Sequence, residues 1–552
     1  MLQSRGHLWH NTYMFFRNVL SLYSPAFVAT LVTEMEAKGY SGWRLLNWFW
    51  HAKSYELKRP VNEMQRSLSV FLGLLMLLQV AIGVGFLVEW ARFGTAGALE
   101  FGVATLIVYP IFWAHVVVVF AWAWNILWAI MHPKKAGNKF VSGIFEWQVR
   151  QLRARHHFKV VAVVGSVGKT STKLAIANLL GQTMRVRHQT GNYNARLTVP
   201  LVFFGLEEPN IYNVFAWIKA FGVSQSEISL PFPYDVVVVE LGTDGPGQLK
   251  EFAYLKPDIA VVTAVSPEHM EFFDGLDGVA AEELSVFDFA KQVLVNGDDI
   301  AGEYLAGRDF KEYSLTSKQA QYRAKPTPHG MVGQKLDVHL GKHEFKSDIN
   351  FLGDQGAKIT LAAAAVANLL GVKKSDIEKG LSELMPFSGR MQVLPGIKDS
   401  TIIDDTYNAS PLAVKAALDV LYASKAKQRI AILGGMNELG DYSRDAHDEI
   451  GQYCDKKKVD VVVTIGKDAK KWLAPAAREK GCTVQAFDSP YDAGAYVSGK
   501  LKEGAVVLAK GSQNGVFAEE ALKPLLANPV DAAKLVRQSD YWLKRKKEQF
   551  PN

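Results

Sequence analysis

The sequence predicts an α/β protein preceded by a two-helix transmembrane hairpin. Three features predict this architecture: two long apolar stretches between residues 61 and 138, an alternation of strand-like and helical runs from about residue 140 onwards, and a glycine-bounded loop at 165–171 between one such strand and helix. Strands that alternate with helices form a mainly parallel sheet covered by helices. We therefore expect a central P-loop domain followed by a Rossmann-like domain.

Four segments are expected: an aromatic and basic juxtamembrane segment at 1–60, the hairpin at 61–138, the central domain at 139–394 and the C-terminal domain at 395–552. The 552 residues can form several hydrophobic cores, and two cysteines, Cys454 and Cys482, are too few for a disulfide framework or a cysteine-rich zinc site. The net charge of +7 is spread along the chain without a basic block interleaved with aromatic residues, so no nucleic-acid partner is expected.

The run Trp43–His51 in the first segment carries tryptophans in a helical pattern. Two interpretations stay open. The run forms a helix at the headgroup level of a membrane, or it forms a soluble helix whose aromatic side chains pack against a neighbour. At the other end of the chain, the basic tail Trp542–Lys547 is expected to be a solvated helix end, with a lipid-binding patch as the alternative.

The predicted hairpin consists of Ser67–Val88 and Phe101–Met131, neither of which contains Asp, Glu, Lys or Arg. Each is long enough to cross a hydrocarbon core of about 30 Å as a helix. Both outer flanks are basic, whereas the link holds Glu89 and Glu100. The positive-inside rule then places both ends, and the catalytic domains, on the cytoplasmic side of the cytoplasmic membrane, with the lipid bilayer as a partner. A buried hairpin in a soluble protein is the alternative.

The loop at 165–171 has the composition of a phosphate cradle. An apolar run, Val160–Val164, precedes it, and a run with helical period begins at Thr172. Loop N–H groups and the helix N-terminus face an anion, Lys169 neutralises phosphate charge, and the Thr170 hydroxyl can hold Mg²⁺. The spacing, Gly-x-x-Gly-Lys-Thr, is shorter than the general P-loop pattern. An ordinary glycine turn between strand and helix is the alternative.

Further polar residues follow the predicted strands, at the sheet edge where ligands bind in open α/β sheets. Glu240 ends a strand and can hold Mg²⁺ opposite Thr170, and His269 follows the next strand, where it can contact a metal or phosphate. Taken alone, each has an ordinary structural alternative. The strands expected are Lys159–Val164, Tyr234–Glu240, Ile259–Ala264, Val293–Asn296, Thr401–Asp404, Arg429–Leu433, Val459–Ile465, Thr483–Phe487 and Ala505–Ala509.

A series of motifs extends this pattern over residues 155–525. They are Gly165-Ser166-Val167-Gly168-Lys169-Thr170-Ser171, Thr190-Gly191-Asn192-Tyr193-Asn194, Val199-Pro200-Leu201, Glu240-Leu241-Gly242, His269, Asn296-Gly297-Asp298-Asp299, Gly389-Arg390, Asp404-Asp405-Thr406-Tyr407-Asn408-Ala409-Ser410-Pro411, Leu433-Gly434-Gly435-Met436-Asn437-Glu438-Leu439-Gly440 with His447, and Lys510-Gly511-Ser512. In this set and order the chain resembles the Mur ligase family, ATP-dependent enzymes that build the peptidoglycan stem peptide. The likeness is greatest to the branch that adds D-alanyl-D-alanine.

The resemblance implies ATP and Mg²⁺ as cofactors and an acyl-phosphate intermediate. It assigns catalytic roles to Lys169, His269 and Arg390, and nucleotide binding to the loop Gly165–Ser171 with Asp404 or Asp405 and Asn408. It assigns Mg²⁺ to Thr170, Glu240 and His269, and substrate contacts to Asn192, Asn194, Asn437 and Lys510. To the catalytic and Mg²⁺ sets we add Glu283 as a hypothesis of our own. The implied partners are a muramoyl-peptide or lipid-linked envelope precursor and an amine such as D-Ala-D-Ala.

Three departures from the family pattern stand out. Glu283 occupies the position of the family's carbamate-modified lysine, and our hypothesis is that Glu283, or its neighbour Glu282, supplies the metal-binding oxygen directly. The alternative is a helix surface charge in an enzyme that has lost the second metal. At Gly353–Gly356 the family often has a basic residue, His and Asn near the adenine. The family's N-terminal UDP-binding domain has no visible counterpart in residues 1–150.

A membrane location suits a lipid-linked acceptor, although the hairpin can equally serve to tether the enzyme near other cell-wall synthesis proteins. Two further functions remain as alternatives to cell-wall precursor ligation. One is a Mur-like ligase of another poly-amino-acid or envelope substrate. The other is a membrane-bound, nucleotide-dependent scaffold with a degenerate site, which the intact set of Lys169, Thr170, Glu240 and His269 argues against.

Overall fold

The computed structural model describes residues 22, 25–37, 42–51, 63–108, 112, 115–116, 119, 133–189, 193–210, 213–513 and 515–551. The chain forms two compact units, Met1–Phe140 and Val141–Asn552, which are considered separately below.

The first unit contains the helix that the sequence predicts as a membrane span. Helix α4 (Glu63–Phe93) continues past the predicted end at Val88. Its part Ser69–Phe93, in which an 18-residue window has a mean hydropathy of 2.5, is long and apolar enough to cross a membrane. It packs antiparallel against the shorter apolar helix Ala98–Val108, where glycines allow close approach: a Cβ on Gly102 would lie 2.9 Å from the carbonyl oxygen of Gly83. Most of the second predicted span, Phe101–Met131, lies outside the described residues, so the two-span hairpin stays a prediction.

Helices α2 (Pro25–Ala37) and α3 (Gly42–His51) complete the described part of this unit. Leu45 and Phe49 of α3 are buried against α2, with the rings of Phe49 and Phe27 6.3 Å apart between centroids. Trp50, on the same helix, is 58% exposed. One side of α3 therefore packs as a soluble helix would, while an exposed tryptophan remains for an interface, and both interpretations of this run stay open.

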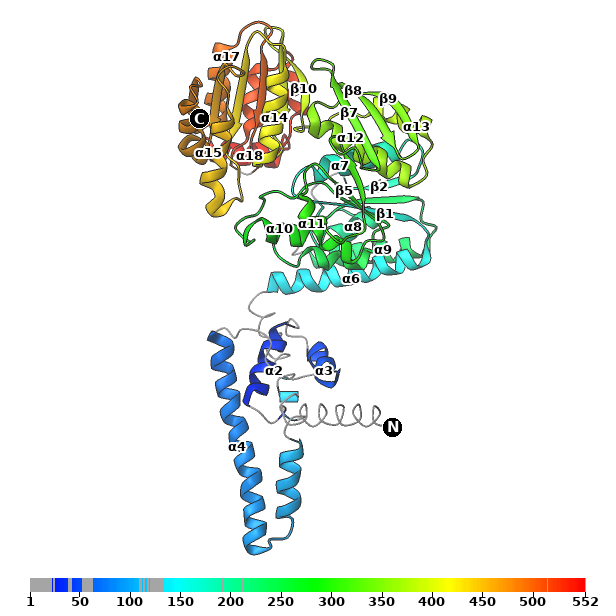
Figure 1. Cartoon of the computed structure of the whole chain (residues 1–552), viewed down its shortest axis with the longest axis vertical. Coiled ribbons are helices and arrows are strands. Elements are labelled where there is room, and N and C mark those ends of the chain that lie inside the picture. The colour runs from blue at the N-terminus through cyan, green and yellow to red at the C-terminus, as the bar shows by residue number, and fades with distance from the viewer. Residues whose placement is uncertain are drawn as a thin grey trace, which may run out of the picture. The chain divides into compact units, whose positions relative to one another are not determined.

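The second unit begins with a nine-stranded sheet of order β2-β3-β1-β4-β5-β6-β7-β8-β9 (Figure 1). Strands β2 to β7 pair in parallel, and the pairs β7–β8 and β8–β9 are antiparallel, so the sheet is mixed. The four strands predicted in this region are confirmed to within two residues. The strands are β1 (Lys159–Val164), β2 (Val186–His188), β3 (Val236–Glu240), β4 (Ile259–Val262), β5 (Val293–Asn296), β6 (Lys311–Ser314), β7 (Tyr322–Pro328), β8 (Gln334–Leu340) and β9 (His343–Ile349).

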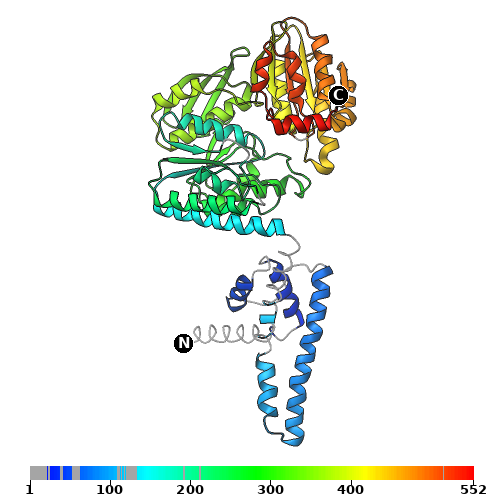
Figure 2. The same ribbon diagram turned by 180° about the vertical axis from the view of Figure 1, so that it is seen from behind.

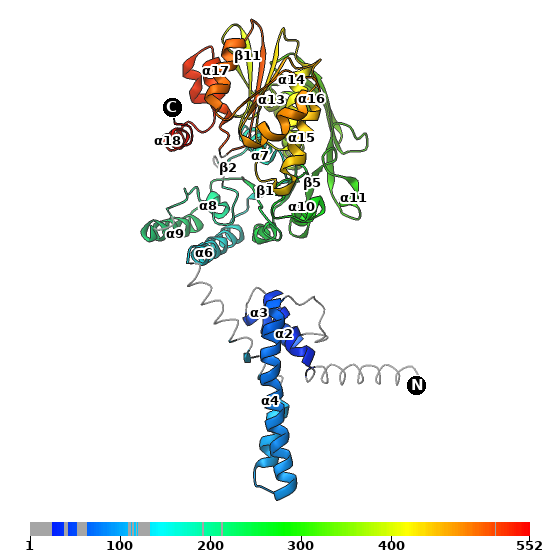
Figure 3. The same ribbon diagram turned by 90° about the vertical axis from the view of Figure 1, so that its left-hand side faces the viewer.

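Strand β1 shows why this sheet is covered on both faces. Val160, Ala162 and Val164 pack into one hydrophobic core, and Val161 and Val163 pack into another. Successive side chains of a strand point to opposite faces, so a strand buried on both reads as a continuous apolar run. The first core lies under α6 (Pro133–Arg155), α8 (Val199–Phe204), α9 (Val214–Ser229) and α10 (Gly275–Glu283), and the second under α7 (Lys169–Leu180), α12 (Gly353–Leu369) and α13 (Lys374–Glu383) (Figure 3).

A six-stranded sheet of order β10-β11-β15-β12-β13-β14 follows, parallel except for β10. All five strands predicted for it are confirmed to within two residues, and β10 is an addition. The strands are β10 (Gln392–Gly396), β11 (Ser400–Asp405), β12 (Arg429–Gly434), β13 (Val461–Ile465), β14 (Val484–Phe487) and β15 (Val506–Lys510). One face packs on α14 (Pro411–Ala423), α15 (Ser443–Tyr453) and α16 (Ala474–Glu479), and the other on α17 (Pro490–Lys500) and the 3₁₀ helix η5 (Ala518–Leu525).

Candidate active site

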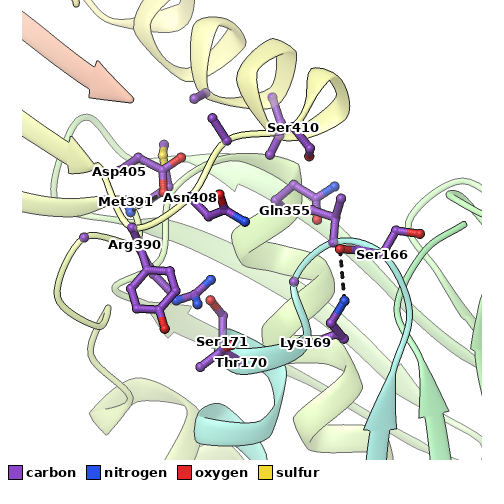
Figure 4. A pocket seen from close by; sticks show the side chains of 18 of the residues that line it. Ser166, Lys169, Thr170, Ser171, Gln355, Arg390, Met391, Asp405, Asn408 and Ser410 are labelled. Atoms are coloured by element: carbon purple, nitrogen blue, oxygen red, sulfur yellow. Dashed lines mark hydrogen bonds between the residues drawn. The ribbon is translucent and has the colours of Figure 1, made fainter. Parts of the chain in front are cut away.

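The glycine-bounded loop lies where β1 ends and α7 begins. Gly165 has φ 115° and Gly168 has φ 85°, a backbone region that favours glycine. A Cβ on Gly165 would also lie 2.5 Å from the Thr263 hydroxyl of the next strand, so the close packing of the loop requires glycine there. The first turn of α7 opens directly from the loop, and its N–H groups favour an anion. Ser166–Ser171 lines a cavity of about 320 Å³ (Figure 4).

Lys169 lies among carboxylates at the base of this cavity. Its Nζ is 3.4 Å from the carbonyl oxygen of Ser166 (dashed in Figure 4) and 3.3 Å from Oε2 of Glu268. Burial alone would lower the pKa of Lys169, but the charges of Glu268, Glu283 and Glu240 outweigh it and raise the pKa. The ammonium therefore stays charged in the closed cavity, as an electrostatic partner for phosphate must.

Thr170 and Glu240 form the second feature of the loop. The Thr170 hydroxyl donates to Oε1 of Glu240 at 3.0 Å, and Nζ of Lys173 lies 3.5 Å from Oε2 of the same carboxylate. Burial lowers the pKa of Lys173, with the nearby charge of Arg390 acting in the same direction. Thr170 and Glu240 both face the cavity. A hydroxyl and a carboxylate oxygen suit Mg²⁺, which usually keeps several waters and adds phosphate oxygens to few protein ligands.

His269 lies opposite the loop, in the left-handed region with φ 52°. Its Nδ1 is 3.2 Å from Oε2 of Glu438, which reaches it from the six-stranded domain, and its Nε2 is 3.7 Å from carboxylate oxygens of Glu268 and Asp244. Glu268 and Asp244 were not anticipated by the sequence analysis. In the described chain no three His, Cys, Asp or Glu side chains converge as a metal site.

Glu283 and Glu282 are both buried and serve different neighbours. Glu282 accepts hydrogen bonds from the N–H groups of Gly247 and Leu249, both at 2.6 Å, and from Thr243, which fixes the start of the 3₁₀ helix η1 (Leu249–Leu255). Oε2 of Glu283 accepts from the Gly165 N–H at 2.7 Å, directly beneath the loop. Burial raises the pKa of Glu283 to about 7, opposed by Lys169 and reinforced by Glu268. Glu283 does not line the cavity, and its role as a metal ligand stays a prediction.

The opposite wall comes from the six-stranded domain. Cζ of Arg390 lies 3.9 Å from the ring centroid of Tyr407, and the side chain extends across the cavity toward the loop (Figure 4). Asp405 accepts from the Met391 N–H at 3.1 Å and from Nζ of Lys510 at 2.5 Å. Nζ of Lys510 also donates to the Asn408 carbonyl oxygen at 3.0 Å. Both carboxylate oxygens of Asp405 are thus held in place by protein groups.

Asp404 points away from the cavity. Its Oδ1 accepts from the N–H and hydroxyl of Thr406 at 3.1 and 2.6 Å, and the residue is fully buried. Burial raises the pKa of Asp404 from 3.8 to about 6. The sequence analysis left Asp404 and Asp405 as alternatives, and only Asp405 lines the cavity.

This difference predicts opposite results for two neighbouring substitutions. Asp405→Asn is expected to weaken nucleotide binding by about tenfold, because a charge-assisted partner of Lys510 is lost, whereas Asp404→Asn leaves binding unchanged. A carboxyl whose pKa is raised on folding stabilises the fold fully below its ordinary pKa, 3.8 for Asp404, and this contribution is lost as pH rises from there through about 6. The apparent melting temperature of Asp404→Asn relative to the unmodified protein should therefore rise with pH. Nucleotide titration and thermal melts from about pH 4.5 to about pH 8 measure both effects, and equal affinity losses in the two variants would contradict this assignment.

The predicted substrate residues are not all found together. Asn194 lines the cavity and packs closely on Gly242, where a Cβ would lie 2.7 Å from its Nδ2. Lys510 lines the cavity with Nζ engaged as described. Asn437 is exposed, does not line the cavity, and donates from Nδ2 to the Gln513 carbonyl oxygen at 2.6 Å. Asn192 lies outside the described residues.

The far end of the cavity is apolar, between α12 and α14. No strong sequence signal marks it, beyond the glycines near 353–356. Its shape depends on Gly353, where a Cβ would meet a methyl group of Val420 at 2.4 Å. Its walls suit a flat, apolar ring better than a charged group. The lining residues are Phe351, Leu352, Ile359, Ala413, Ala416, Ala417 and Val420.

The phosphate-binding loop of the first α/β domain and the cationic side chains of Arg390 and Lys510 from the second line the same cavity. This arrangement is that of a nucleotide-dependent enzyme. Comparison with known proteins identifies the family to which the chain belongs. Residues 163–367 match the Mur ligase middle domain, and residues 389–513 match the Mur ligase, glutamate ligase domain. The chain belongs to the Mur ligase family and is an ATP-dependent ligase.

Relatives within the family agree with this assignment. The chain is 26% identical over 379 residues, 67% of its length, to the UDP-N-acetylmuramoyl-tripeptide–D-alanyl-D-alanine ligase of Bacillus subtilis, of which 77% is covered. It is 28% identical over 68% of its length to the enzyme of the same name from Synechocystis, again over 77% of that protein. Among solved structures, MurF from Acinetobacter baumannii has a TM-score of 0.57 at 21% identity, covering 70% of this chain and 79% of that one. MurF from Thermotoga maritima in complex with ADP has a TM-score of 0.56 at 22% identity, covering 69% and 83%. The two structures share the fold with this chain.

Proposed function

We propose that this protein is a membrane-anchored amide ligase that acts through an acyl phosphate on a muramoyl-peptide cell-wall precursor, with D-Ala-D-Ala or another amine as the second substrate. The observation that carries the proposal is that Lys169 and Thr170 of the loop line the same cavity as Arg390 and Asp405 of the six-stranded domain. The names of the curated relatives support the substrate class. The family assignment favours an enzyme over a scaffold.

The proposed reaction has two steps. A substrate carboxylate oxygen attacks the γ-phosphorus of ATP, and the bond from that phosphorus to the β-phosphate oxygen breaks. ADP departs, and the substrate is now an acyl phosphate. The amine nitrogen then attacks the acyl carbon, inorganic phosphate departs with its electron pair, and the amine gives up a proton as the amide forms. Because two anions must approach one another in the first step, the cations Lys169 and Arg390 have to face the transferred group.

We assign the metal sites to Thr170, Glu240 and His269, which line the cavity, and to Glu283, which lies beneath the loop. Thr170 and Glu240 would hold one Mg²⁺, for which their oxygens are suited. A second Mg²⁺ would lie beside His269, with Glu283 supplying an oxygen in place of a carbamate. The metal would neutralise charge that develops on the transferred phosphoryl group. One carboxylate oxygen of Glu283 accepts a hydrogen bond from the Gly165 N–H, so a metal would bind the other oxygen.

The remaining contacts are assigned by position. The loop Gly165–Ser171, Asp405 and Asn408 bind the nucleotide, and the apolar end between α12 and α14 takes its base. Asn194 contacts the carboxylate substrate and Lys510 faces the amine, and the family resemblance adds Asn192 to the first contact and Asn437 to the second. The apolar helix Ser69–Phe93 anchors the protein in the cytoplasmic membrane, with the ligase domains in the cytoplasm, near lipid-linked precursors and other cell-wall synthesis proteins.

The test is a choice between precursor pools. We would incubate the full chain in detergent with ATP, Mg²⁺ and D-Ala-D-Ala, offering UDP-linked and lipid-linked muramoyl peptides in parallel, and follow product mass by mass spectrometry. One pool should gain the mass of D-Ala-D-Ala less one water, because the amide forms by condensation, with one ADP released per product. The Lys169→Met variant is the control and should form product roughly 10³-fold more slowly. If neither pool gains mass with D-Ala-D-Ala or with other amines, the cell-wall assignment is wrong, although the family membership stands.

A further inference from the structure

A segment beyond the residues that match the family domains packs directly behind the active-site loop 405–408. Arg537 lies between the 3₁₀ helix η6 (Pro529–Lys534) and the last helix, α18 (Asp540–Gln549), which is red in Figure 2. Its Nη1 donates to the carbonyl oxygen of Tyr407 at 3.0 Å, and its Nη2 donates to that of Thr406 at 2.6 Å. One guanidinium thus holds two consecutive carbonyls of the loop.

Arg537 is itself held from behind by buried charges. Its Nε and Nη2 donate to the two carboxylate oxygens of Glu519 at 2.9 and 2.7 Å. Nζ of Lys546 lies 2.8 Å from Glu519 and 2.6 Å from Glu520, and it donates to the Arg537 carbonyl oxygen at 2.8 Å. The side chains of Arg537, Glu519 and Lys546 are 7%, 0% and 0% exposed. Bidentate, desolvated pairing of this kind fixes the guanidinium in one orientation.

Tyr407 connects the loop held by Arg537 to the wall of the cavity. The Tyr407 N–H donates to the Gly389 carbonyl oxygen at 3.0 Å, and the Tyr407 ring stacks under Arg390 at 3.9 Å. The same segment touches the other side of this junction, because a Cβ on Gly389 would lie 2.7 Å from Cγ1 of Val536. Arg390 and Tyr407 both line the cavity, whereas Arg537 does not.

We propose that Arg537 is a positioning residue of the nucleotide site: by holding the Thr406 and Tyr407 carbonyls it fixes Tyr407, and through Tyr407 it orients the Arg390 guanidinium toward the phosphates. The proposal rests on the proposed role of this cavity in binding ATP. It makes the C-terminal helix α18 part of the ligase machinery, since Lys546 on that helix braces the Glu519 carboxylate that holds Arg537.

The test measures binding of a non-hydrolysable ATP analogue with Mg²⁺ by calorimetry, in the full chain. Arg537→Lys keeps the charge opposite Glu519 but cannot span both carbonyls. We expect Arg537→Lys and Arg390→Lys each to weaken binding of the analogue by about tenfold. The double variant should bind almost as well as the single variant with the larger loss, because the effects of residues that act through one another are not additive. A merely structural role for Arg537 would give additive losses.

The control is Gln538→Ala, which lies in the same buried network but has no bond to the loop: its Nε2 donates to Glu520 at 3.2 Å and to the Val536 carbonyl oxygen at 2.8 Å. It should bind the analogue as the unmodified protein does. Equal losses in Gln538→Ala and Arg537→Lys, additive losses in the double variant, or an Arg537→Lys variant that binds normally would each overturn the proposal. A wild-type protein that binds no analogue would overturn the proposed nucleotide site together with it.

Discussion

Replacing Lys169 with methionine is expected to lower kcat by roughly 10³-fold, the size of effect seen when a preorganised electrostatic group is removed. The substitution keeps most of the length of the unbranched side chain and removes its charge. That charge lies 3.3 Å from Glu268 in a region where Glu240 and Glu283 also raise the pKa of Lys169. Without the ammonium, the negative charges of Glu268, Glu283 and Glu240 lose the cation that offsets them at the loop, so nucleotide binding should weaken as well as the chemical step. Initial rates of ADP release against ATP concentration separate the two effects.

The matched control for this prediction is Lys250→Met. Lys250 belongs to the same domain, and its Nζ pairs with Asp288 at 3.1 Å, but its side chain is 60% exposed. Exposed pairs contribute little, so stability and turnover should hardly change. A Lys169→Met variant that keeps more than about a tenth of the normal kcat would be incompatible with transition-state stabilisation by this residue.

Much of the sheet architecture could be predicted because its strands are short apolar runs rich in β-branched residues. Val160–Val164 and Val236–Val239 have no polar residue and are buried on both faces. The strands that were missed have weaker signals. β2 and β6 have three and four residues, too few for a period to show. β8 does alternate, with Gln334, Leu336, Val338 and Leu340 buried, and a stricter test for period two would have found it.

The active site was predictable to the extent that strand ends mark it. The rule that selected Glu240 and His269 applies equally to Asp244 and Glu268, which follow the same two strands and lie beside His269. The choice between Asp404 and Asp405 could not be made from sequence, because neighbours on a strand point to opposite faces and nothing local says which face holds the cavity.

The contacts of the C-terminal tail were beyond sequence analysis for a different reason. Arg537 and Tyr407 are 130 positions apart, so no local pattern connects them. The basic run at 544–547 has the composition of a solvated helix end, and that expectation is wrong for Lys546, which is 0% exposed and paired with Glu519 and Glu520. Buried lysines are identified by partners that only the fold brings together.

Replacing Glu283 with glutamine is expected to raise the Mg²⁺ concentration needed for half-maximal activity by about tenfold and to lower kcat by about 10²-fold, the range for lost metal-site groups. The physical reason lies in what the change preserves. The glutamine carbonyl can still accept the Gly165 N–H, which Glu283 accepts at 2.7 Å, so the phosphate loop keeps its shape. Only the negative charge offered to a cation is lost. Mg²⁺ titrations of initial rate at saturating ATP, with thermal melts alongside, measure the effect.

Glu282→Gln is the control, because Glu282 is a buried neighbour whose carboxylate is taken up by the N–H groups of Gly247 and Leu249 and by Thr243. It should change thermal stability and leave the Mg²⁺ requirement as it is. If Glu283→Gln leaves both the Mg²⁺ requirement and turnover unchanged, Glu283 does not replace the carbamate, and its contact with Gly165 is then its whole function. A Glu283→Ala variant tests this structural role by itself, because it also removes the hydrogen bond to the Gly165 N–H. It should destabilise the loop by about 1–3 kcal/mol, the cost of leaving a buried N–H unpaired.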